Sequence, residues 1–191
     1  MKRQIFTLTV LLAGIVSFAQ KSTDYKLRSL TKLNLELQGF GFSFEPRIGN
    51  IATVDLSAGI GTGGYDIWAE SFTYVVYPQG PTAFISITPK IYYNRKKRME
   101  KGKLIALNSG NYFGLRIKYT TRSISENSDI RDALLYNAHW GMQRAIAKRW
   151  ILATHFGVGY AIDATDLSNS EGTFYPALDL KFSYILNKRR G

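Results

Sequence analysis

An alternation of apolar and polar residues with a period of two runs through most of this 191-residue chain. Successive side chains of a β-strand point to opposite sides of the sheet, so this alternation indicates strands with one apolar face. Between Phe174 and Leu186 every even position is uncharged, whereas the odd positions include Asp179, Lys181 and Ser183. The same rule holds over residues 33–38, 40–48, 52–61, 83–93, 112–119, 134–143 and 150–162. The pattern predicts an all-β fold with eight antiparallel strands.

The phase of the alternation changes once, around Gln38 and Gly39. Apolar residues occupy odd positions from Leu33 to Leu37 and even positions from Phe40 onwards. A slip of one residue turns a strand over, so two structures are open: a tight turn between two short strands, or a bulge in one long strand. We favour the turn, which completes the count of eight strands.

The first 19 residues have the features of a secretory signal peptide. Lys2 and Arg3 form a basic start, an apolar run extends from Ile5 to Val16, and Ser17 and Ala19 are small residues before a predicted cleavage site. The apolar run is shorter than the roughly 20 residues of a membrane-spanning helix. We therefore expect export and removal of residues 1–19. With no cysteine in the chain, disulfides, thiolate metal sites and a lipoprotein anchor are excluded.

The formal net charge of +11 permits nucleic-acid binding on composition alone. Export weakens that interpretation, and we predict no nucleic-acid partner. No segment after the leader approaches 18 consecutive apolar residues, which excludes a helical membrane protein.

Alternating strands permit two opposite barrels. A soluble lipocalin-like barrel directs its apolar face inward, around a ligand, and a membrane barrel directs it outward, into lipid. Here the uncharged face carries the bulky side chains, whereas the other face mixes glycines with charges. An eight-stranded barrel is only just wide enough inside for side chains, so the bulky face is predicted to point into lipid. Aromatic residues lie towards the strand ends, as in the girdles of membrane barrels: Tyr93, Tyr119, Tyr136, Trp140, Trp150, Tyr160, Phe174 and Tyr184.

The chain resembles the small eight-stranded outer-membrane β-barrel proteins of Gram-negative bacteria. The resemblance is carried by Leu33–Leu35 leading into Phe42–Arg47, by Ser109–Leu115, and by the aromatic last strand. It implies an antiparallel up-and-down transmembrane barrel in the outer membrane, with outer-membrane lipid as its partner. We expect a periplasmic segment over residues 20–28, the barrel over 29–187 and a basic tail over 188–191.

Connection lengths are consistent with this orientation. The turns at Gly49-Asn50 and Ala147-Lys148 are short, whereas residues 63–81, 123–131 and 163–172 form longer connections. Outer-membrane barrels have short periplasmic turns and long outer loops. The basic run from Arg95 to Lys103 is the exception, because it falls on the periplasmic side and exceeds a minimal turn. It is most simply a solvated turn, and contact with anionic lipid headgroups is the alternative.

The predicted inward face carries nearly balanced charges, so we expect a polar lumen filled by side chains. Buried charges persist when they are paired and hydrogen-bonded. The predicted lumen network consists of Glu36, Glu45, Arg47, Asp55, Lys90, Arg116, Lys118, His139, His155, Asp179 and Lys181. A narrow pore or proton path is the functional alternative.

His139 and His155 are predicted to point inward from adjacent strands. A three-residue turn at 146–148 would place them opposite each other. Two imidazoles can bind a metal or sense pH, but no third ligand is fixed by spacing, and we predict a hydrogen-bonded pair with no metal or cofactor. Pro89 lacks the N–H that a closed barrel requires, so we expect a local bulge there.

Residues 65–77 are unusually apolar for an outer loop. They include Tyr65, Trp68, Phe72, Tyr74 and Tyr77, which either extend or cover the barrel or form a hairpin that binds a partner protein or surface ligand. No Gly-x-Ser-x-Gly motif is present, and neither histidine lies on an outer loop. We expect a non-enzymatic protein with a structural or surface-binding role. The alternatives are a narrow channel, a lipid-acting enzyme and a soluble carrier.

Overall fold

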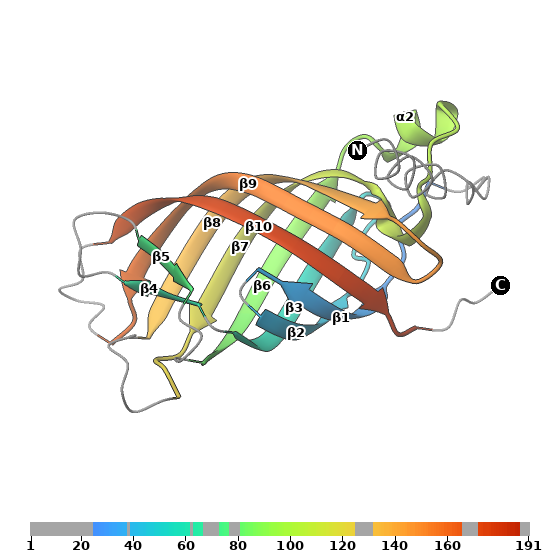
Figure 1. Ribbon diagram of the computed structural model, residues 1–191. Helices are drawn as coiled ribbons and strands as arrows, with labels where there is room; N and C mark the ends of the chain where they lie inside the picture. Colours follow the sequence, from blue (N-terminus) through green and yellow to red (C-terminus); the bar gives the residue numbers. More distant parts are fainter. Residues whose placement is uncertain are drawn as a thin grey trace, which may run out of the picture.

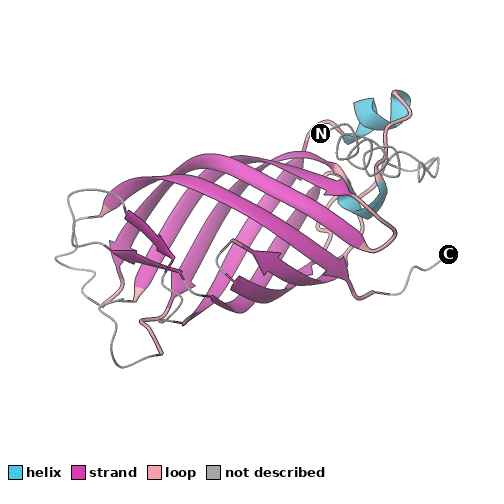
Figure 2. Ribbon diagram, in the orientation of Figure 1, coloured by secondary structure: helices cyan, strands magenta, loops and turns pink. Residues whose placement is uncertain are grey.

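The protein is a closed antiparallel barrel of eight strands in a computed structural model (Figures 1 and 2). The structure describes residues 25–37, 39–61, 63–66, 73–76, 81–124, 132–165 and 172–187, with only the backbone for 63–66 and 73–76. The barrel strands are β1 (Leu30–Glu36), β2 (Gly39–Glu45), β3 (Ala52–Gly61), β6 (Thr82–Tyr92), β7 (Gly110–Thr120), β8 (Ala133–Ala145), β9 (Trp150–Asp163) and β10 (Thr173–Ile185). Each pairs with the next barrel strand along the chain, and β1 pairs with β10 to close the barrel.

The predicted count of eight barrel strands is confirmed, as is the turn between two short strands. β1 and β2 pair as a hairpin in which Glu36 lies opposite Gly39, and Gly39 has a φ of +141°. That backbone conformation favours glycine, and the chain reverses direction between Glu36 and Gly39. The phase change in the sequence is therefore a turn.

The two ends of the barrel differ in structure. β1 begins and β10 ends at one end, here called the termini end, where the helix α2 (Arg95–Glu100) and the short 3-10 helix η1 (Ala106–Asn108) also lie (Figure 1). At the opposite end, β4 (Gly63–Asp66) and β5 (Thr73–Val76) form a separate two-stranded sheet. Within the described residues, no helix is long and apolar enough to cross a membrane.

The side chains alternate between an exposed outer face and a buried inner face. The exposed outer face carries large apolar residues from every barrel strand, including Phe40, Phe113, Phe156 and Leu178. The buried inner face is mostly polar, and it includes Lys32, Glu45, Asp55 and His139. A soluble lipocalin-like barrel requires the reverse arrangement, with its apolar face inward.

Pro89 produces a gap in the ladder without a bulge, so the expected bulge was wrong. Between β6 and β7, the pairs Ile87–Ile117 and Lys90–Gly114 belong to one continuous register, and Thr88 and Pro89 between them do not pair with β7. On its other side, Pro89 lies opposite Val54 of β3. Because the missing N–H faces only one neighbour, the strand loses local pairing with β7 and keeps its register.

Candidate functional site

Four charged side chains form an ion cluster inside the barrel, in the half nearer the termini end. Lys32 of β1 contacts both Glu45 of β2 and Asp55 of β3, and its Nζ lies 2.7 Å from Asp55 Oδ2. Lys90 of β6 lies 2.7 Å from the same Asp55 oxygen and 3.8 Å from Glu45 Oε2. All four residues are buried. Two ammonium groups and two carboxylates thus neutralise one another across four strands, and we call these four residues the ion cluster.

Neutral donors complete the coordination of the two carboxylates. The Thr53 hydroxyl donates to Glu45 Oε1 at 2.8 Å, and the Tyr92 hydroxyl donates to the same atom at 3.1 Å. The Ser57 hydroxyl donates to Asp55 Oδ1 at 2.8 Å. A buried carboxylate is stable when its oxygens are paired and hydrogen-bonded, and both carboxylates of the ion cluster meet that condition.

Two further ion pairs lie in the interior. Arg116 of β7 lies 3.4 Å from Asp179 of β10, which is not a neighbouring strand. Lys181 of β10 lies 2.7 Å from Glu36, the residue opposite it on the adjacent strand β1. Lys118 of β7 is buried with its Nζ 4.4 Å from the centre of the Phe84 ring, a cation–π contact. Lys90 makes a second contact of this kind, with its Nζ 5.2 Å from the centre of the Tyr112 ring, so the interior combines ion pairs with cation–π contacts.

Sequence reasoning missed Lys32, and it misplaced Arg47. Lys32 lies two residues before Asn34 on the same face of β1, so the alternation extended by one step would have found it. Arg47 lies beyond the end of β2, where it is exposed and donates to the Leu27 carbonyl oxygen at 3.4 Å. The alternation stops with the strand, so it does not apply to Arg47.

The two histidines meet in the interior, but they do not lie opposite each other as predicted. His139 lies opposite Gly157, and His155 lies opposite Gly141, because the connection between β8 and β9 spans residues 146–149. The two residues are diagonal neighbours, and their imidazole rings stack with ring centres 4.0 Å apart. Neither ring nitrogen of His139 has a hydrogen-bond partner among the described residues, so the expected hydrogen-bonded pair is a stacked pair instead.

Glycines opposite His139 and Tyr112 leave room for the rings of these two residues. A Cβ atom on Gly114 would lie 2.6 Å from His139 Nε2, and one on Gly141 would lie 2.3 Å from Tyr112 Cζ. Both distances are below any normal contact. Gly114 and Gly141 are therefore sites where an aromatic ring approaches the backbone closely.

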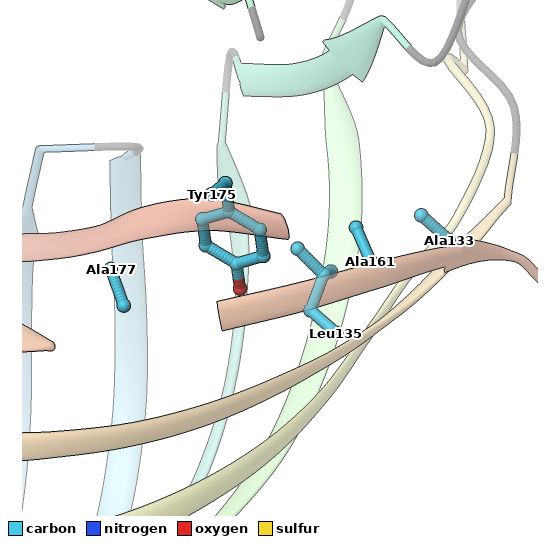
Figure 3. Close-up of a cluster of buried hydrophobic side chains, with 5 residues drawn as sticks. All are labelled: Ala133, Leu135, Ala161, Tyr175 and Ala177. Atoms are coloured by element: carbon cyan, nitrogen blue, oxygen red, sulfur yellow. The ribbon is translucent and has the colours of Figure 1, made fainter. Parts of the chain in front are cut away.

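The half of the interior farther from the termini holds an apolar cluster. It consists of Ala133, Leu135, Ala161, Tyr175 and Ala177, from β8, β9 and β10 (Figure 3). The Tyr175 hydroxyl donates to Asn137 Oδ1, so its polar atom is satisfied. This cluster contains no ionised group.

The termini end is closed by the segment that precedes β1. Leu27 is buried against Tyr92 and Tyr112, which line the interior. The buried Arg95 guanidinium of α2 donates to the carbonyl oxygens of Tyr25 at 2.9 Å and Lys26 at 3.1 Å. Its NH1 also donates to the carbonyl oxygens of Ile105 and Ser109, each at 3.0 Å. One buried side chain thus fastens residues 25–26 to the connection between β6 and β7.

Asn108 fastens the same segment a second time. Its side chain accepts a hydrogen bond from the Arg28 N–H at 2.9 Å and donates to the Arg28 carbonyl oxygen at 2.8 Å. The basic run from Arg95 to Lys103 is predicted to be a solvated turn, and its lysines are exposed. Its Arg95, however, is buried, and together with the buried Asn108 it holds the closing segment in place.

A small cavity of about 10 Å³ lies among the charged groups of the interior. Its lining includes Asp55, Lys90, Arg116, His155 and Lys181. A cavity of this volume accommodates about one water molecule. Among the described residues, no group of three or more histidine, aspartate or glutamate side chains is arranged to hold a metal ion.

The aromatic segment 65–77 falls largely outside the described residues. Its backbone at Tyr65 and Tyr74 is described, and these two residues are paired in the β4–β5 hairpin. Trp68, Phe72 and Tyr77 lie outside the described residues, as do the predicted signal peptide at 1–19 and the basic tail at 188–191. The hairpin joins with none of the barrel strands to form one sheet.

Comparisons of the chain with protein-family models, with curated proteins and with solved structures found no significant match. The class that the structure itself defines is a closed eight-stranded antiparallel β-barrel with a buried ion cluster.

Proposed function

We propose that this chain is a small outer-membrane β-barrel protein with a structural or surface-binding role, and that it is not an enzyme. The observation that carries the proposal is the direction of the side chains: apolar ones point outward from the barrel, and charged ones point into it. Large apolar side chains are exposed on all eight barrel strands, and Leu178 is 63% exposed in mid-strand. Contiguous apolar surface of that extent is unfavourable in water and favourable in a bilayer. Lipid is therefore the proposed partner of the outer face.

Export supports the same proposal. The leader-like residues 1–19 direct the chain out of the cytoplasm, and the even number of strands puts both termini on one side of the membrane. In this arrangement the termini end is periplasmic, and the β4–β5 end faces outward.

The interior argues against a channel, the alternative function. Its ion pairs leave a cavity with room for about one water molecule, and Leu27 lies across the termini end. A conducting pore requires a continuous file of water. In planar bilayers we expect no reproducible single-channel steps. Steady, ion-selective current steps that change in the Arg116→Ala or Lys118→Ala variant would contradict this proposal and favour a channel function.

The surface-binding role is assigned to the aromatic segment 65–77. Crosslinking in intact outer membranes, with and without this segment, tests that assignment. We expect crosslinked partners that are lost on deletion of 65–77, while the barrel still inserts. An identical set of partners with and without the segment would contradict the role.

Gel migration and membrane fractionation test the proposal as a whole. The unboiled protein should migrate differently from the boiled protein on a detergent gel, because a closed barrel resists unfolding by detergent at room temperature. It should also remain with outer membranes after a salt wash. Release by salt alone would show that charge, and not insertion, holds the protein there. Recovery in the aqueous periplasmic fraction would favour the soluble carrier, and activity in a lipid-processing assay would favour the enzyme.

A further inference from the structure

The termini end of the barrel carries a strongly basic surface. The described segments that lie beyond the strands at this end are residues 25–29, 46–51, 93–109 and 146–149. They contain one acidic residue, Glu100, and eleven basic ones: Lys26, Arg28, Arg47, Arg95, Lys96, Lys97, Arg98, Lys101, Lys103, Lys148 and Arg149. Of the basic residues, Arg95 is buried and Arg98 is half-buried, and the other nine are exposed. We call these nine residues the basic rim.

The sequence segments at the opposite end are mainly acidic. The segments that join the strands there, residues 37–38, 62–81, 121–132 and 164–172, contain two basic residues, Arg122 and Arg131. They contain seven acidic residues: Asp66, Glu70, Glu126, Asp129, Asp132, Asp166 and Glu171. In the sequence, the excess of positive charge therefore lies in the segments of the termini end and not in those that join the strands at the other end.

Basic groups at the termini end lie against aromatic rings on the outer face. The Arg149 guanidinium donates to the Tyr184 hydroxyl at 3.3 Å and lies 6.0 Å from the centre of that ring. Tyr184 in turn packs edge-on against Trp150 at 5.2 Å. Both Arg149 and Trp150 are exposed.

A second aromatic and basic group lies elsewhere on the circumference. Trp140 Nε1 donates to the Tyr93 hydroxyl at 2.9 Å, and Tyr93 stacks on Phe113. The half-buried Arg144 guanidinium is held beside them by the side chain of Asn111, whose amide also donates to the Tyr93 hydroxyl at 3.4 Å. Tryptophan and tyrosine favour the boundary between hydrocarbon and headgroups, so both groups place positive charge at headgroup height.

From these observations we propose that the basic rim and the two aromatic groups bind the phosphate groups of anionic phospholipids in the leaflet at the termini end. This inference rests on the proposed membrane insertion. The charge complements anionic headgroups, and the aromatic rings fix the depth of the arginines beside them. The surface then selects anionic phospholipid from a mixed bilayer and orients the barrel across it.

The tryptophans provide a direct test, because two of the three in the chain lie at this end. Replacing the third, Trp68→Phe, leaves fluorescence from Trp140 and Trp150 only. The full chain is reconstituted in bilayers that contain trace brominated phosphatidylglycerol or trace brominated phosphatidylcholine, and quenching by the two lipids is compared. We expect phosphatidylglycerol to be enriched about fivefold or more around these tryptophans at low salt, and the preference to fall in about 0.5 M salt.

Variants on the basic rim sharpen the test. The triple variant Lys96→Gln, Lys97→Gln, Lys101→Gln and the single variant Arg149→Gln should each reduce the preference for phosphatidylglycerol. Arg122→Gln, an exposed arginine at the opposite end, is the matched control and should leave it unchanged. Equal reduction by Arg122→Gln would overturn the assignment to the termini end.

The remaining outcomes separate this inference from the proposed function. Equal quenching by both brominated lipids would show an inserted barrel without selection and would overturn the inference alone. If the basic rim then bound soluble polyglutamate, its partner would be a soluble polyanion and not lipid. Absence of quenching by either lipid would overturn the proposed insertion, and this inference with it.

Discussion

The two halves of the barrel interior are built from the same alternating strands but are held together differently. Near the termini, Lys32, Glu45, Asp55 and Lys90 form an ion cluster that spans four neighbouring strands. Farther away, the apolar cluster around Tyr175 contains no ionised group. The ion cluster depends on charge balance, whereas the apolar cluster depends on volume. The difference shows that polarity of the inner face does not by itself determine how that face is stabilised.

Removing one charge from the ion cluster should lower the free energy of unfolding more than any other single change proposed here. Asp55→Asn keeps the side chain volume but leaves Lys32 and Lys90 with one carboxylate between them. Removing one member of a buried ion network costs about 3–5 kcal/mol. The free energy of unfolding, measured by urea titration of the refolded barrel in lipid, should fall by that amount. The double variant Asp55→Asn, Lys90→Met restores neutrality and should recover part of the loss, and a loss below about 1 kcal/mol in the single variant would contradict the ion cluster's role.

The outer face should give the next largest effect. Leu178→Arg places a charge on the proposed lipid-facing side in mid-strand and should cost about 2–4 kcal/mol in the same titration. Leu178→Gln is the uncharged control and should cost less. If Leu178→Arg were as stable as the wild type in lipid, the outer face would not contact hydrocarbon.

In the apolar cluster, volume should matter more than polarity. Ala177→Leu adds carbon atoms beside Tyr175 in a buried site, and overpacking of this kind costs about 1–3 kcal/mol. The matched change on the outer face of β8, Ala138→Leu, should be close to neutral because Ala138 is exposed. Equal costs at the two positions would mean that the cluster is not tightly packed.

Removing a neutral hydrogen bond beside the ion cluster should lower the free energy of unfolding least. The Ser183 hydroxyl donates to Asn34 Oδ1 at 2.8 Å, and Ser183→Ala should cost about 0.5–1.5 kcal/mol. This cost should lie well below that of Asp55→Asn, although both residues are buried in the same half. A cost equal to that of Asp55→Asn would show that hydrogen bonding, and not charge, dominates this half.

The alternation was sufficient to predict the strands and the side of each strand that carries the bulky residues. These features depend on the period of the backbone, which each segment shows independently of the others. The partners of the inner charges were not predictable in the same way. Lys32 reaches Asp55 across β2, and the alternation within a single strand does not specify a contact between side chains two strands apart.

Register and local pairing were the other limits of sequence reasoning. The histidines are offset because their connection spans residues 146–149, and turn length is not encoded in the alternation. Pro89 was expected to force a bulge, but the strand tolerates a gap on one side because β3 pairs it on the other. Arg95 is buried within a basic run whose lysines are all exposed, so composition alone did not distinguish it from its neighbours.

The facing of β10 in a bilayer tests the central claim most directly. The chain has no cysteine, so single cysteines can be introduced from Pro176 to Ser183 and spin-labelled without background. Collisions with oxygen, which concentrates in hydrocarbon, and with a water-soluble nickel chelate are then measured at each position. We predict high oxygen accessibility at the even positions and low accessibility to both reagents at the odd positions. High nickel accessibility at the even positions, or high oxygen accessibility at the odd positions, would contradict a barrel with its apolar face in lipid.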